Sequence, residues 1–133
     1  MKITRRIIIT DFKDIPKIVK EIGEIKGIKA VYLFGSYASG KFGPLSDIDL
    51  CVIGKFSEKE KTEVYGFGSD NLDISVFDDL PVYIKFRVLR EGKPLLVKDI
   101  EFLNRTKFKT LQEYLDFKPA INRFCMETLK CTI

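Results

Sequence analysis

The sequence predicts an α+β fold with a small β-sheet and a helical C-terminal part. Short apolar runs typical of strands alternate with helical patterns before position 99, and only helical patterns follow it. The 133 residues are enough for one hydrophobic core but not for two. We therefore expect a single domain over residues 1–133, with an N-terminal extension at 1–10 and C-terminal helices at 99–133.

The first predicted helix begins after Asp14, an N-cap residue that is followed by Pro16 in the first turn. Apolar residues then recur at helical spacing from Ile15 to Ile25, and Gly27 is expected to end the helix. The apolar run at 29–34 predicts the first strand.

Two further strands are predicted in the middle of the chain. One runs from Asp47 to about Ile53, after a loop at 40–46 whose glycine and proline argue against a helix. The other covers 72–77, where apolar residues alternate only in part. The polar stretch 54–61 is predicted to be a surface connection.

Helical patterns dominate the last third. Apolar residues spaced from Val82 to Leu89 predict a helix ended by Gly92, and a short apolar run follows at 94–97. Two more helices are expected at 100–117 and 120–130, because the proline between them disfavours helical backbone in the residue before it.

The composition, with 45% hydrophobic and 32% charged residues, is that of a soluble globular protein. The absence of histidine excludes Ser-His and Cys-His catalytic pairs and histidine-based zinc sites, so carboxylates are the expected catalytic groups. Three cysteines show neither disulfide nor zinc spacing, and Cys51, within an apolar strand, is interpreted as a core residue. No run suits a signal peptide or a membrane span, so we expect a cytoplasmic protein.

Charge divides the chain into three parts. Residues 1–34 carry eight basic and four acidic groups (+4), residues 35–80 carry four and nine (−5), and residues 81–133 carry eleven and six (+5). An acidic centre suits a cation site, and basic flanks can attract a nucleotide or an acidic partner. A solvated surface of mixed charge explains any single lysine equally well.

The stretch 35–50 carries the strongest chemical signal. Its Gly-Ser pair follows an apolar run, which fits a strand that turns into a helix, where free backbone N–H groups bind phosphate oxygens. Ten residues after Ser36, Asp47 and Asp49 alternate in a strand, so their side chains share one face. Adjacent carboxylates repel unless a cation lies between them, which indicates a divalent metal beside a phosphate site. Asp73 is a third carboxylate in an apolar strand, costly to bury without a partner such as a metal.

A Gly-Ser pair, ten residues, Asp-x-Asp and a later aspartate form the signature of the minimal nucleotidyltransferases of the DNA polymerase β superfamily, which this chain strongly resembles. The resemblance implies a polymerase β-like palm fold, with a small mixed β-sheet flanked by helices on one side. It also implies ATP as the substrate and two Mg²⁺ ions. The implied catalytic and metal-binding residues are Asp47, Asp49 and Asp73, and the implied nucleotide-binding residues are Gly35, Ser36 and Ser46.

The resemblance continues through Leu80-Pro81 and the segments 87–96 and 113–119, which are similar to the subgroup that acts as antitoxin beside a HEPN ribonuclease toxin. This implies transfer of AMP from ATP to a tyrosine hydroxyl of the toxin. The implied partners are the HEPN-type toxin and the nucleotide triphosphate. Neither a membrane nor a nucleic acid is expected as a partner, and a homo-oligomer is compatible with the pattern.

Alternatives to this function stay open. Ser39 stands where many relatives have an arginine, and a guanidinium there could contact phosphate. Without this guanidinium, the chain could also be a non-catalytic antitoxin that neutralises its toxin by stoichiometric binding. Nucleotidyl transfer to RNA or to a small molecule is a further alternative. For single residues, the plainer interpretations are a turn with an N-cap at Gly35-Ser36 and exposed strand-end acids at the aspartates.

Overall fold

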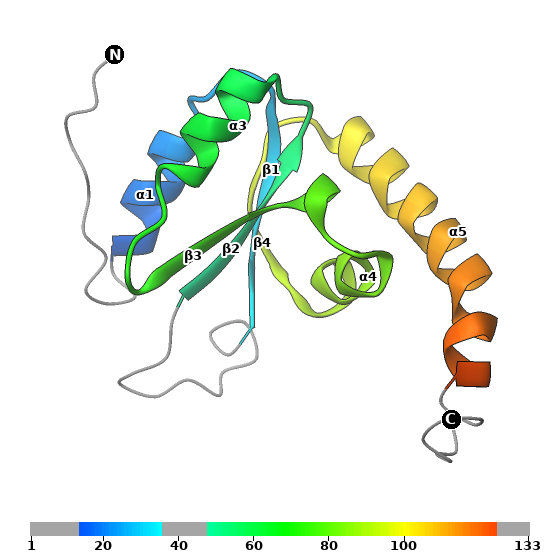
Figure 1. The fold of residues 1–133 in the computed structure, drawn as a ribbon. Helices are drawn as coiled ribbons and strands as arrows, with labels where there is room; N and C mark the ends of the chain where they lie inside the picture. Colours follow the sequence, from blue (N-terminus) through cyan, green and yellow to red (C-terminus); the bar gives the residue numbers. More distant parts are fainter. Residues whose placement is uncertain (1–13, 36–47, 125–133) are drawn as a thin grey trace.

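A four-stranded mixed β-sheet forms the centre of the fold (Figure 1). The computed structural model describes residues 14–35 and 48–124, with side chains up to residue 117. The antiparallel pairs are β1 with β2 and β1 with β4, whereas β2 and β3 are parallel. Along the sheet the order is β3-β2-β1-β4. The strands are β1 (Ile28–Phe34), β2 (Ile48–Gly54), β3 (Leu72–Val76) and β4 (Lys93–Val97).

Helices cover both faces of this sheet (Figure 1). On one face α1 (Ile15–Ile22) and α3 (Glu58–Tyr65) pack onto the strands, and on the other face α4 (Val82–Glu91) and α5 (Ile100–Phe124) do so. The predicted α+β fold with a small mixed sheet is confirmed, but the expected placing of helices on one side is wrong. The strands bury apolar side chains on both faces, and each face therefore needs a helical layer to exclude water.

The first helix is shorter than predicted. Asp14 takes the expected N-cap position, although its side chain makes no capping hydrogen bond. α1 ends at Ile22 with Gly23 as its C-cap, and a Cβ at Gly23 would lie only 2.7 Å from Cδ2 of Leu96. The lack of a side chain at Gly23 therefore leaves room for Leu96 of β4. Gly27, the expected stop, lies in the connection before β1 with a φ of 97°.

A helix, α3, occupies the stretch that was expected to be a surface connection. Its start is a capping box: Ser57 Oγ accepts the Glu60 backbone N–H at 3.2 Å, and the Glu60 carboxylate accepts the Ser57 N–H at 2.9 Å. Val64 is its buried contact with the core. This helix carries the chain from β2 to the parallel strand β3.

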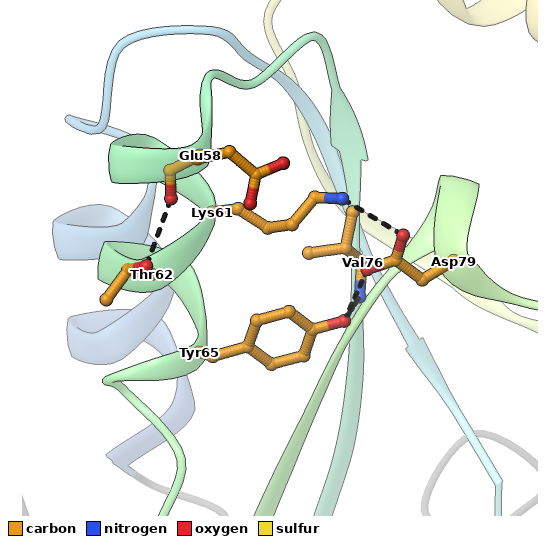
Figure 2. Close-up of polar contacts among 6 residues, drawn as sticks. All are labelled: Glu58, Lys61, Thr62, Tyr65, Val76 and Asp79. Carbon is orange, nitrogen blue, oxygen red and sulfur yellow. Dashed lines mark hydrogen bonds and ion pairs between the residues drawn. The ribbon is translucent and has the colours of Figure 1, made fainter.

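A polar network holds α3 against the end of β3 (Figure 2). The Asp79 carboxylate accepts hydrogen bonds from Lys61 Nζ at 3.0 Å and from the Tyr65 hydroxyl at 2.9 Å. The Tyr65 oxygen in turn accepts the Val76 backbone N–H at 3.4 Å. The bonds from Lys61 and then Tyr65 lower the pKa of Asp79, and burial followed by the bond to Asp79 raises the pKa of Tyr65. Asp79 belongs to the short 3-10 turn Phe77–Asp79.

The later elements agree with prediction except at the C-terminus. α4 lies between Pro81 and Gly92, and β4 follows it, as expected. Instead of two helices broken near Pro119, α5 is one helix of 25 residues. A proline removes one backbone donor, and the helical pattern on both sides of it outweighs that loss here. Predicted features within 1–13, 36–47 and 125–133 lie outside the described residues.

None of the described helices is long and apolar enough to cross a lipid bilayer.

Candidate active site

Two of the predicted carboxylates, Asp49 and Asp73, are neighbours at the end of the sheet where β2 and β3 begin. The parallel register pairs Asp49 directly with Asp73, and neighbouring strands in a sheet lie about 4.8 Å apart. Paired residues point to the same face, which here is the face covered by α4 and α5. The sheet therefore brings these two side chains together. Asp47, the third predicted carboxylate, lies outside the described residues.

Gly35 follows β1 and lies against the Asp49 carboxylate. Its φ of 81° is in the left-handed region, which favours glycine. A Cβ built on Gly35 would collide with Oδ2 of Asp49 and lie 3.3 Å from its Cγ. Because Gly35 has no side chain, it leaves the space that the Asp49 carboxylate occupies. Ser36 and Ser46, the other predicted nucleotide-binding residues, are outside the described part of the chain.

Phe34 is a neighbour of Asp49 that the sequence interpretation missed. The antiparallel register pairs Phe34 with Asp49, and Phe34 is half-buried against the core under α4 and α5. Across the sheet, Asp49 therefore has an apolar ring on one side and the carboxylate of Asp73 on the other. The sequence alone could not identify this neighbour, because only the register of the sheet shows which residues lie opposite each other.

The carboxylate pair has the chemistry of a magnesium site. Asp49 is half-buried and Asp73 is exposed. The protein therefore surrounds part of the Asp49 carboxylate, whereas the Asp73 carboxylate can be reached from solvent. Carboxylate oxygens are hard ligands that Mg²⁺ prefers, and a cation relieves the repulsion between them. The residues present thus fit a divalent cation. No group of three or more potential metal-ligating side chains occurs within 14–35 and 48–117, and Asp47, the expected third ligand, falls between these ranges.

Cys51 lies two residues further along β2, on the same face as Asp49. It is fully buried, and this burial, reinforced by the charge of Asp78, raises the pKa of its thiol to about 12. Almost no thiolate, the nucleophilic form, exists at neutral pH. The interpretation of Cys51 as a core residue is therefore confirmed.

Other acidic residues near these strands stand apart from the pair. Asp79 is bound by Lys61 and Tyr65 at the opposite end of β3 from Asp73. Asp70 is an exposed residue in the turn that precedes β3. Neither residue is among the site residues that the sequence predicts.

Comparison with known proteins relates the chain to one family. Residues 13–118 match the family model described as the nucleotidyltransferase domain. A protein of Methanocaldococcus jannaschii, provisionally named a protein adenylyltransferase, is 28% identical over 95 residues, which are 71% of this chain and 77% of the relative.

Solved structures show the same fold. A chain of a toxin–antitoxin complex with AMP-PNP has a TM-score of 0.66 at 19% identity, covering 90% of this chain and 98% of that one. A chain of the complex between the tri-AMPylated HEPN toxin of Shewanella oneidensis and its MNT antitoxin has a TM-score of 0.62 at 19% identity. That comparison covers 90% of this chain and 95% of the other. The fold expected from the sequence motif is thereby confirmed.

Proposed function

The chain belongs to the nucleotidyltransferase domain family, whose model it matches over residues 13–118, and we propose that it is an antitoxin that AMPylates its toxin. In this proposal AMP passes from ATP to a tyrosine hydroxyl of a cognate HEPN toxin with the help of Mg²⁺. The observation that carries the proposal is the pairing of Asp49 with Asp73 beside Gly35.

The comparisons support the finer parts of this proposal. The relative from Methanocaldococcus jannaschii is named for protein adenylyl transfer. Chains of similar fold occur in toxin–antitoxin complexes, one with AMP-PNP and one with a tri-AMPylated HEPN toxin. The acidic centre and basic flanks of the present chain suit a cation and a polyphosphate.

The proposed roles follow from the chemistry of each residue. Asp49 and Asp73, with Asp47, would hold Mg²⁺, which neutralises charge on the triphosphate and on the leaving group. Gly35 would let phosphate approach the backbone because it has no Cβ, and Ser36 and Ser46 would donate hydrogen bonds to phosphate oxygens.

The acceptor would be activated from the exposed side of the pair. Asp73 is exposed, so a tyrosine hydroxyl of a docked partner can reach it and give it a proton. The tyrosine oxygen then forms a bond to the α-phosphorus as the bond to pyrophosphate breaks. Phe34 is placed to exclude water from the other side of Asp49. Because positioning and charge neutralisation supply most of the catalysis, a small chain is sufficient.

Transfer of label from α-labelled ATP to a co-expressed HEPN toxin tests this function. We expect Asp49→Asn and Asp73→Asn each to slow transfer by about 100-fold or more, equal to ~2.7 kcal/mol of transition-state stabilisation. Asp70→Asn, which removes an exposed carboxylate from a nearby turn, is the matched control and should transfer at the normal rate. Undiminished transfer by the Asp49→Asn, Asp73→Asn double variant would rule out the proposed site.

Neutralisation by binding alone predicts a different result. Ser39, in place of the arginine of many relatives, is the feature that favours this second function. The intact mass of the partner after co-expression separates the two functions, because AMPylation adds AMP units and binding adds nothing. A partner that is neutralised with unchanged mass would support binding alone.

A further inference from the structure

The helix α4 crosses the face of the sheet that carries Asp49 and Asp73. It begins after the 3-10 turn that follows β3, and it ends at Gly92. A Cβ on Gly92 would lie 3.1 Å from the carbonyl oxygen of Leu33 in β1. The helix therefore passes from the edge strand β3 over β2 to β1. Figure 1 shows α4 almost end-on, whereas the strands are seen along their length.

The contacts of α4 show which of its sides faces which end of the strands. Val88 is buried in the core beneath the helix, and Nζ of Lys85 lies 5.5 Å from the centre of the Phe77 ring. Phe77 comes directly after β3, at the end of that strand away from Asp73. The side of α4 that carries Lys85 therefore faces away from the carboxylate pair.

Arg87 and Glu91 lie on the opposite side of α4. Residues two positions apart in a helix are rotated by about 200°, so Arg87 points away from both Lys85 and Leu89. Glu91, four positions after Arg87, shares its side. Arg87 and Glu91 form what is called the site-facing side below, because it is turned toward the strand ends where the carboxylate pair lies. Their side chains are 63% and 50% exposed, so both can be reached from solvent.

Two arginines share the single carboxylate of Glu91. Nη2 of Arg90 lies 2.6 Å from this carboxylate, and Nη2 of Arg87 lies 3.7 Å from it. Arg90 also lies over the ring of Phe86, which stacks on Tyr114 of α5. Glu91 is therefore compensated chiefly by Arg90, and an exposed pair such as Arg87–Glu91 contributes little. The Arg87 guanidinium can thus turn to another anion at small cost.

We propose that Arg87 binds the triphosphate chain of the nucleotide, an inference that rests on the proposed nucleotidyl transfer. A guanidinium offers two parallel N–H donors to phosphate oxygens and keeps its charge at neutral pH. Negative charge grows on pyrophosphate as its bond to the α-phosphorus breaks. A guanidinium on the site-facing side stabilises that charge.

The position of α4 favours phosphate over an acidic group of a partner protein. Gly92 touches Leu33, which precedes Gly35 by two residues. The last turns of α4 therefore lie beside the end of β1, where the proposed phosphate-binding turn starts. Arg87 belongs to these turns and faces the same strand ends as the carboxylate pair.

Isothermal titration calorimetry of the full chain with Mg²⁺ tests the proposal with two probes. One is a non-hydrolysable ATP analogue, and the other is inorganic tripolyphosphate, which has the phosphates without the nucleoside. We expect Arg87→Ala to weaken both probes about tenfold or more, and Arg87→Lys to lie between it and the wild type. Arg105→Ala is the matched control, because Arg105 lies over Phe102 beside Lys29, near the start of β1, and both probes should bind it normally.

Glu91→Gln separates contact with phosphate from a structural role in α4. This variant breaks the ion pair of the site-facing side but keeps the Arg87 guanidinium, so its affinity for either probe should stay within about twofold of the wild type. Equal losses in Glu91→Gln and Arg87→Ala would assign the effect to the ion pair and overturn the proposal. Circular dichroism of each variant checks that α4 stays helical.

Other results would also overturn the proposal. Wild-type affinity of Arg87→Ala for both probes would do so and leave the proposed function intact. A loss confined to the nucleotide analogue would place Arg87 against the nucleoside instead. Unchanged probe binding together with weaker association with a co-expressed toxin would assign Arg87 to the partner protein. A wild type that binds neither probe would overturn the proposed function as well.

Discussion

Gly35 and Asp49 constrain each other within a small space. The backbone at Gly35 has a φ of 81°, and a Cβ there would collide with the Asp49 carboxylate. A single methyl group at this position would therefore change the backbone energy and the position of the carboxylate together. Because no charged group is removed, the effect of moving the Asp49 carboxylate can be measured separately from the effect of losing its charge.

Gly35→Ala is expected to lower both stability and transfer activity. The left-handed conformation costs an alanine about 1–2 kcal/mol, which urea unfolding measures. Displacement of Asp49 should reduce AMP transfer further, even at temperatures where the variant is fully folded. Gly66→Ala is the control, because Gly66 has an ordinary φ of −65° at the end of α3 and touches no carboxylate. Unchanged transfer by Gly35→Ala would contradict the proposed coupling.

The Cys51 thiol should not react while the protein is folded. Burial and the charge of Asp78 raise its pKa to about 12, so at pH 8 its thiolate fraction is more than about 1,000-fold below that of a free cysteine. Iodoacetamide labelling of a Cys125→Ser, Cys131→Ser variant, followed by peptide mass spectrometry, measures this residue alone. Labelling should begin only in denaturant, and rapid labelling under native conditions would show that the thiol is accessible.

At the level of elements, the position of α3 depends on its cap and on the network that ties it to β3. The helix has a single buried apolar contact, Val64, so polar interactions contribute much of what fixes it. Ser57→Ala removes the capping box and should cost about 1 kcal/mol of unfolding free energy. Ser69→Ala, which loses only a 3.4 Å contact to Asn71, is the matched control. Equal stabilities of the two variants in urea would show that the cap contributes nothing.

The Asp79 network should contribute stability that depends on pH. Because the pKa of Asp79 is lowered in the folded state, the folded protein binds fewer protons than the unfolded chain near that pKa. The stabilisation is therefore present above about pH 4, the ordinary value, and is lost as the pH falls through the lowered value. Asp79 is 41% exposed, so solvent screening limits the contribution to about 0.5 kcal/mol. Asp79→Asn should thus be less stable than wild type at pH 7, and the difference should shrink as the pH falls below about 4. Asp70→Asn, which removes an exposed carboxylate from a turn, is the control for the loss of a charge.

Most elements could be predicted from local patterns, and the exceptions have physical causes. Apolar spacing predicts the strands and α4, and Gly92 marks the end of α4. The signal for α3 was present as Ser57 followed three residues later by Glu60, but the helix has too little apolar periodicity to be found from spacing. α1 ends at the glycine C-cap Gly23, whereas the sequence interpretation chose Gly27, four residues later.

At the scale of the whole molecule, the candidate site depends on how distant segments pair. The Gly-Ser and Asp-x-Asp spacing identifies residues locally, but the pairing of Asp73 with Asp49 requires β3 to lie parallel to β2. That pairing needs the α3 crossover, and the place of Phe34 needs the antiparallel register with β1. The sequence motif therefore identifies the carboxylates, whereas the residues that lie beside them are known only from the pairing of the strands.

Binding of Mg²⁺ and nucleotide should stabilise the whole fold, because the proposed ligands Asp49 and Asp73 come from two different strands. A ligand that binds only the folded state adds about 2.7 kcal/mol at 100 times its Kd, which corresponds to a rise of several degrees in Tm for a chain of this size. Thermal unfolding with a non-hydrolysable ATP analogue should show this rise with Mg²⁺ and lose most of it when EDTA removes the metal. Asp73→Asn should lose the metal-dependent part of the rise, whereas Asp70→Asn should keep it. If the nucleotide stabilises the Asp73→Asn variant as much as the wild type, Asp73 does not hold the metal, and the proposed site must be built from other carboxylates.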